Sequence, residues 1–137
     1  MKYYRVYKTS AFTLIEILIV VSVIGVLIAL GSLNYANSLE RGRDQRRRAD
    51  IQNIRANLEL YKSRQPDSFY PTTLAVLRTA GFEVSQDPRE KVDYAYSPVN
   101  DTGTACTNTL NNFCTRYTLS ATLELGGTYS VTERLSN

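Results

Sequence analysis

The sequence predicts an α+β fold, in which a long N-terminal helix packs on a small antiparallel sheet of three to four strands. Three observations lead to this class. A long apolar run lies near the N-terminus, no proline occurs before Pro66, and an alternating stretch at 116–125 is followed by Gly126-Gly127. The first two favour one long helix. The third favours strands joined by a hairpin.

The apolar run is long enough to span a membrane. From Phe12 to Leu33 it has 22 residues, and Glu16 is its one charged residue. At about 1.5 Å per residue this length covers about 33 Å, enough for the core of a bilayer. A removed secretory signal is the alternative, but its apolar region has roughly 7 to 15 residues and precedes an A-x-A-like cleavage site, which is missing here. We therefore expect residues 12–33 to form a retained transmembrane helix.

The helix is expected to continue through residues 34–64 with a different face pattern. Four apolar residues follow steps of three and four and share one side, while arginines and amides occupy much of the rest. These residues are Ile51, Ile54, Leu58 and Tyr61. This stripe needs a covering layer, which the downstream segment supplies.

Residues 65–137 predict a globular head with an antiparallel sheet. Turn residues at Pro66 and Pro71 precede a short helix around 74–77, which Gly81 ends. Alternation places Val92, Tyr94 and Tyr96 on one face of a first strand. In the stretch 116–125, one face carries Tyr117, Leu119, Ala121, Leu123 and Leu125, and the other carries Thr118, Ser120, Thr122 and Glu124. Gly126-Gly127 then marks a hairpin that returns through Tyr129 and Val131.

Cys106 and Cys114 lie in a short polar loop. A disulfide between them suits an oxidising compartment and would stabilise the head by about 2 to 3 kcal/mol. The alternative is two reduced thiols in a cytoplasmic head. Two cysteines without a histidine or a second cysteine pair fall short of a zinc site, so we expect no metal.

The stretch Lys8-Thr9-Ser10-Ala11-Phe12-Thr13-Leu14-Ile15-Glu16 resembles the class III signal of type IV pilins and type II secretion pseudopilins. The resemblance implies a leader over residues 1–11, cleavage between Ala11 and Phe12 by the prepilin peptidase, and N-methylation of Phe12. Ala11 departs from the family, which prefers glycine before the cut.

An ionised glutamate in hydrocarbon is unfavourable by roughly 2.5 to 3.5 kcal/mol. The resemblance implies that Glu16 pairs with the N-terminal ammonium of a neighbouring subunit and so sets the register of assembly. A cation in low dielectric would offset much of that unfavourable energy. The alternative is that Glu16 lies near the lipid headgroups and needs no partner.

The family resemblance also implies partners and location. The chain would be a homo-oligomer in a helical filament, held in the bacterial inner membrane until an assembly platform and its ATPase extract it. Afterwards it would be extracellular, at the cell surface. The Tyr70-Pro71-Thr72 turn, Asp87-Pro88 and Tyr94-x-Tyr96 resemble the major pseudopilin, whereas SATLELGGTYSV replaces its calcium loop. A pilin is therefore favoured over a pseudopilin.

Enzymatic chemistry has little support in the sequence. The chain has no histidine, which excludes Ser-His and Cys-His triads, and no phosphate-binding glycine motif. We predict no catalytic residue and no cofactor. A pair of acids such as Asp87 and Asp93 stays open, because spacing alone does not place them.

The basic run RGRDQRRR, with ten tyrosines in the chain, is also typical of phosphate binding. Weak DNA binding by a filament subunit is therefore one alternative. The favoured interpretation is that these arginines pair with Glu40, Asp44, Asp50 or acidic parts of the head.

Orientation has conflicting signals. Three cations precede the apolar run, and five arginines between 41 and 48 follow it, which by the positive-inside rule favours a cytoplasmic head. The cysteine pair favours a head outside. We expect the head outside, and the rival is a monomeric single-pass binding or sensor module with its head in the cytoplasm.

Overall fold

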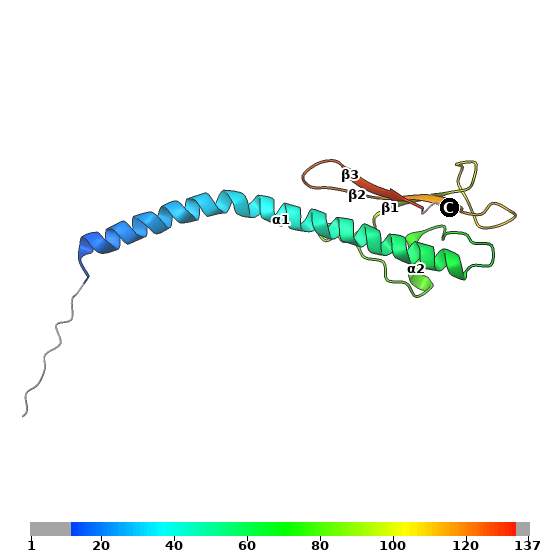
Figure 1. The fold of residues 1–137 in the computed structure, drawn as a ribbon, viewed down its shortest axis with the longest axis horizontal. Coiled ribbons are helices and arrows are strands. Elements are labelled where there is room, and N and C mark those ends of the chain that lie inside the picture. The colour runs from blue at the N-terminus through cyan, green and yellow to red at the C-terminus, as the bar shows by residue number, and fades with distance from the viewer. Residues whose placement is uncertain (1–11, 134–137) are drawn as a thin grey trace, which may run out of the picture. The chain divides into compact units, whose positions relative to one another are not determined.

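The computed structural model of the 137-residue chain describes residues 12–133, and the side chains of residues 30–34 lie outside the description. The elements follow in the order α1 (Leu14–Arg64), α2 (Leu74–Thr79), β1 (Ala95–Val99), β2 (Arg116–Thr122) and β3 (Thr128–Thr132). The chain divides into two compact units, Met1–Ser38 and Leu39–Asn137. The long helix α1 and a three-stranded antiparallel sheet confirm the predicted α+β class (Figure 1).

Helix α1 ends where local chemistry predicts. Lys62 and Arg64 lie in its last turn, where cations favour the negative end of the helix dipole. The amide of Gln65 still donates to the carbonyl of Lys62 at 3.1 Å, and Pro66 then restricts the preceding residue to extended backbone. The long helix predicted from the absence of proline is confirmed.

The predicted apolar stripe of α1 forms the centre of the core in the second unit. Ile51, Ile54 and Leu58 are fully buried, and Tyr61 is 8% exposed. The sheet lies along this part of α1 (Figure 1). The core therefore joins α1, α2 and the sheet into one packed body.

The sheet has the order β1-β2-β3, and both pairs are antiparallel. In β2, Tyr117, Leu119 and Ala121 are buried, as the alternation predicts. Val131 on β3 lies opposite Leu119 and is also buried. The described residues contain three strands and no fourth.

Two parts of the strand prediction are wrong. Val92 is 52% exposed and precedes β1, so it does not share a buried face with Tyr94. Strand β2 ends at Thr122, so the alternation does not extend to Leu123, Glu124 and Leu125, and Leu125 is 53% exposed. The chain leaves the strand early because it turns at Gly126 and Gly127, whose φ values of +98° and +85° suit glycine.

Helix α2 is short and well capped. The hydroxyl of Thr73 accepts a hydrogen bond from the amide of Val76 at 3.3 Å, and the side chains of Leu74 and Leu77 are buried. Gly81 follows with φ +87°, as expected for a residue just beyond a helix end.

Candidate functional site

The start of α1 is set by Thr13. Its carbonyl accepts from the amides of Glu16 at 3.1 Å and Ile17 at 3.3 Å, and its hydroxyl accepts from the amide of Glu16 at 3.4 Å. Thr13 and Glu16 have the spacing of a capping box. Glu16 is exposed in the first helical turn, where its charge favours the helix dipole. Among the described residues its carboxylate makes no ion pair.

The N-terminal half of α1 exposes apolar side chains along its whole described length. The large hydrophobic residues between Phe12 and Ile28 are from 48% exposed at Ile24 to 84% exposed at Leu14. Soluble monomers rarely expose a contiguous apolar surface of this extent, so this segment needs a partner surface or lipid.

Three sequence predictions involve residues outside the full description. Among the helical residues that the structure describes in full, no stretch is both long and apolar enough to cross a membrane. The predicted span over 12–33 includes residues 30–33, whose side chains are not described. Ala11 lies outside the described residues, as does the predicted leader, so cleavage before Phe12 and its methylation stay predictions.

Comparison with protein families bears directly on this N-terminal segment. Residues 7–32 match the family described as Prokaryotic N-terminal methylation motif. The chain carries the class III signal of type IV pilins and pseudopilins. The methylation motif is not that of an enzyme family. No curated protein and no solved structure matches the chain.

Beyond the methylation motif, a partly buried charge cluster ties the β2–β3 loop to α1. We define this charge cluster as Arg43, Asp44, Arg47, Asp87 and Glu124. Arg43 binds Glu124 through two hydrogen bonds of 2.8 and 2.6 Å. Arg47 contacts Asp87 at 2.6 Å, Asp44 at 2.8 Å and Glu124 at 2.9 Å.

Asp44 adds a backbone contact to the charge cluster. Its two carboxylate oxygens accept from the amides of Glu124 at 2.9 Å and Leu125 at 3.1 Å. Arg47 is 3% exposed, so its charge is nearly removed from water and three carboxylates compensate for it. The cluster therefore fixes the hairpin loop against the helix.

The charge cluster shifts the pKa values of its members. Hydrogen bonds from Arg43 lower the pKa of Glu124 from 4.5 to about 2. Hydrogen bonds from Arg47 hold the pKa of Asp87 well below its usual range. Burial acts to raise the pKa of Asp44, but hydrogen bonds from the backbone amides of Glu124 and Leu125 and from Arg47 outweigh it and lower this pKa.

The charge cluster bears on the prediction that the arginines between 41 and 48 pair with acids. Arg43 and Arg47 pair with acids of the head in the same chain, and Asp44 is one of the predicted partners. Asp50 instead accepts a 2.8 Å hydrogen bond from the hydroxyl of Tyr94. Arg41, Arg46 and Arg48 are exposed, and Arg48 lies over the ring of Tyr129 at 5.2 Å.

Asp87 and Asp93, the two acids that the sequence left open as a pair, each bind an arginine. Asp87 binds Arg47, whereas Asp93 binds Arg78 at 2.8 Å and accepts from Gln86 at 3.0 Å. Arg78 is the main cause of the lowered pKa of Asp93. Within the described part of the chain, no three acids, cysteines or histidines gather as metal ligands do.

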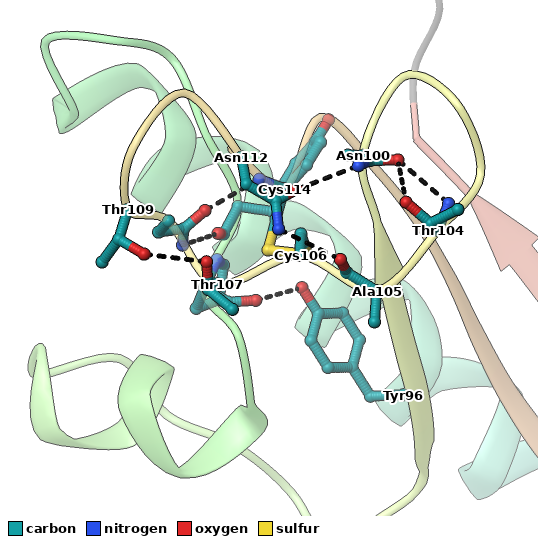
Figure 2. The surroundings of a disulfide bond; sticks show 12 residues. Tyr96, Asn100, Thr104, Ala105, Cys106, Thr107, Thr109, Asn112 and Cys114 are labelled. Carbon is teal, nitrogen blue, oxygen red and sulfur yellow. Dashed lines mark hydrogen bonds between the residues drawn. A yellow bond between two sulfur atoms is a disulfide. The ribbon is translucent and has the colours of Figure 1, made fainter.

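A second ordered region is the loop between β1 and β2. Cys106 and Cys114 form a disulfide, and Cys114 is fully buried (Figure 2). Three asparagines hold this loop. Asn108 donates to the carbonyl of Tyr70 at 2.8 Å and accepts from the amide of Cys114 at 2.7 Å.

The other two asparagines join neighbouring parts of the loop. Asn100 donates to Asn112 at 2.9 Å, and Asn112 donates to the carbonyl of Ala105 at 3.2 Å (Figure 2). The ring of Phe113 stacks on Phe69 with centroids 5.5 Å apart. The disulfide is thus one of several restraints on a loop that contains few regular hydrogen bonds.

Sequence reasoning predicted that the arginines pair with acids but did not identify Asp87 and Glu124 as partners, and it missed the asparagine network. The alternation places Glu124 on the same strand face as Thr118 and Thr122, whereas Glu124 lies in the β2–β3 loop with its side chain 10% exposed. The sequence signal that could indicate the network is the recurrence of asparagines at 100, 108 and 112 around the cysteine pair. Asparagine is a common residue of turns whose side chain binds nearby backbone.

Proposed function

We propose that this chain is a pilin, the structural subunit of a type IV pilus-like filament. The observation that carries this proposal is the methylation motif at residues 7–32, followed by an exposed apolar helix. In this proposal, residues 12–33 anchor the chain in the bacterial inner membrane before assembly, with the head outside. Prepilin peptidase cuts before Phe12, and the assembly platform and ATPase extract the subunit.

Filament cohesion would come mainly from apolar burial. Each square ångström of apolar surface removed from water contributes about 25 cal/mol, so the side chains between Phe12 and Ile28 supply a large driving force without any specific polar contact. That force is non-directional. A carboxylate at Glu16 that meets the N-terminal ammonium of a neighbour would select one register among many apolar packings.

A pseudopilin of type II secretion is the second candidate, because the same signal serves both kinds of filament. The β2–β3 loop favours a pilin. Its carboxylate Glu124 is held by Arg43 and Arg47 and its turn is made by two glycines, so the loop is built as a plain hairpin. Surface fibres that disappear on deletion would support a pilin, and loss of protein secretion with no fibres would support a pseudopilin.

The decisive experiment is N-terminal sequencing of the mature protein, together with imaging of sheared surface material. A chain that begins with methylated Phe12 and is found in fibres is expected. An intact Met1 on a monomer in the membrane fraction would overturn the proposal and favour the single-pass sensor or binding module.

A further inference from the structure

Leu110 is at the tip of the disulfide loop, in a conformation that leucine seldom adopts. The amide of Asn112 donates to the carbonyl of Thr109 at 2.9 Å, which closes a tight turn over Leu110 and Asn111. Their φ values are +50° and +64°. Turns with two left-handed central residues favour Asn-Gly, because a Cβ crowds the following carbonyl. The local backbone therefore gives no reason for leucine at this position.

The fold of the head gives no reason either. Leu110 is 99% exposed, so its side chain adds nothing to the core. The disulfide and the hydrogen bond from Asn112 to Ala105 hold the loop on one side of the turn (Figure 2). The hydrogen bond from Asn108 to the carbonyl of Tyr70 holds it on the other. The loop thus presents one apolar side chain rigidly to the surroundings. Exposure of one leucine alone is ordinary, but an exposed leucine held in an unfavourable backbone conformation by its support points to a functional contact.

The same chain has a groove that such a tip can enter. A groove of about 450 Å³ follows α1 and is lined by Gln52, Arg55, Ala56, Glu59, Leu60 and Ser63. Ala56 and Leu60 supply its apolar floor, and Leu60 is 51% exposed. The Nε of Arg55 is buried and has no acceptor in the part of the chain that is described. An incoming backbone carbonyl within reach of this Nε would supply the missing acceptor.

The placement and charge of the two surfaces suit a contact between copies of this chain. The loop lies at the end of the second unit where α1 ends (Figure 1). The groove lies on the flank of α1, along residues 52–63. A copy shifted along the direction of α1 therefore brings its tip toward the flank of the next copy. The residues between the cysteines carry no charge, and the groove carries one arginine and one glutamate, so no single-sign charge is desolvated.

We infer that Leu110 of one copy inserts into the groove around Ala56 and Leu60 of the next copy. Such a contact uses two different surfaces, so it is heterologous, and in the helical arrangement of the proposed filament it repeats along the fibre. The inference rests on the proposed filament and adds a specific contact between heads to the apolar packing of the N-terminal helices.

The direct test is a photoreactive amino acid at position 110 in the full-length chain, activated in cells that assemble the filament. A crosslinked dimer whose second peptide contains residues 52–63 is expected. A crosslink to another protein or to another part of the chain, or no crosslink in intact filaments, would overturn the inference.

Substitutions supply a second test. Leu110→Asn is expected to raise the Tm of the full chain in detergent by about 2 to 6 °C, because asparagine tolerates the left-handed turn. The amount of sheared filament should fall at least fivefold. Ala56→Glu, which fills the groove, should give the same loss. Leu125→Asn is the matched control, since Leu125 is another exposed loop leucine, and it should leave filaments unchanged.

The outcomes separate the inference from the proposed function. Normal filaments from Leu110→Asn or Ala56→Glu would overturn the contact and leave the pilin proposal standing. This outcome is expected if the chain's own C-terminal residues fill the groove. If the wild-type chain forms no filaments, both the pilin proposal and the Leu110 contact are overturned.

Discussion

The Nη1 atom of Arg47 lies 2.9 Å from Oε1 of Glu124, and this contact joins α1 to the loop that connects β2 and β3. Both side chains are at least nine-tenths buried. The β2–β3 hairpin is therefore held at its tip by ion pairs between side chains and along its strands by apolar packing. This arrangement makes the stability of the head depend on charges as well as on its apolar core.

Truncation of Arg47 should destabilise the head strongly. Arg47→Ala leaves Asp44, Asp87 and Glu124 without their shared cation, and removal of one partner from a buried ion pair is unfavourable by about 3 to 5 kcal/mol. Denaturant unfolding of the full chain in detergent measures the free energy of unfolding. Arg46→Ala, on an exposed neighbour, should change it by less than about 0.5 kcal/mol. Equal effects of the two variants would contradict the role of the charge cluster.

The charge cluster should also make the head sensitive to acid. The pKa of Glu124 is lowered from 4.5 to about 2, and the pKa values of Asp44 and Asp87 are lowered as well. Because these carboxyls bind protons less readily in the folded state, their stabilising contribution is present above about pH 5 and is lost as the pH falls toward 2.

The measurement is the urea midpoint of the full chain between pH 2 and pH 7. The wild type should lose stability steadily below about pH 5. Glu124→Gln removes one of the titrating groups, so its curve should be flatter, although its stability at pH 7 should be lower. A wild-type midpoint that does not change with pH would show that the charge cluster does not stabilise the head.

Much of the core could be predicted from sequence because periodicity reports directly on burial. Ile51, Ile54 and Leu58 repeat at helical spacing, and their complete burial needs no knowledge of the partner. The same holds for Tyr117 and Leu119 in β2. Positions where a strand ends are harder, because the alternation continued through Leu125 while the backbone had already left the sheet.

The residues of the candidate site also differ in how far the sequence could predict them. The signal around Phe12 and Glu16 is contiguous, so sequence alone could identify it. The pairing of Arg47 with Asp87 and Glu124 joins residues far apart in the chain, and any of five arginines could have been the partner. Leu110 carries no periodic signal, since its interest comes from backbone conformation and exposure.

Loss of the disulfide should have a moderate effect on stability. Cys106 and Cys114 are eight residues apart, and a loop of this size corresponds to about 2 to 3 kcal/mol in the chain-entropy description. The double variant Cys106→Ala/Cys114→Ala should lose this amount in denaturant unfolding. Reduction of the wild type should give the same loss, and the double variant should not respond to reductant. Wild-type protein that is insensitive to reductant and contains two free thiols would favour the reduced alternative.

The assembly role of Glu16 can be separated from its role at the helix start. Thr13 and Glu16 have capping-box spacing, so a change to alanine removes both the charge and the capacity to hydrogen bond at the first turn. Glu16→Gln keeps the hydrogen-bonding capacity and removes the charge alone. If Glu16 pairs with the N-terminal ammonium of a neighbour, both variants should insert into the membrane normally and both should lose most of the sheared filament. Normal filaments from Glu16→Gln together with defective filaments from Glu16→Ala would assign Glu16 to helix capping, and the register of assembly would then have to come from the apolar side chains and the head.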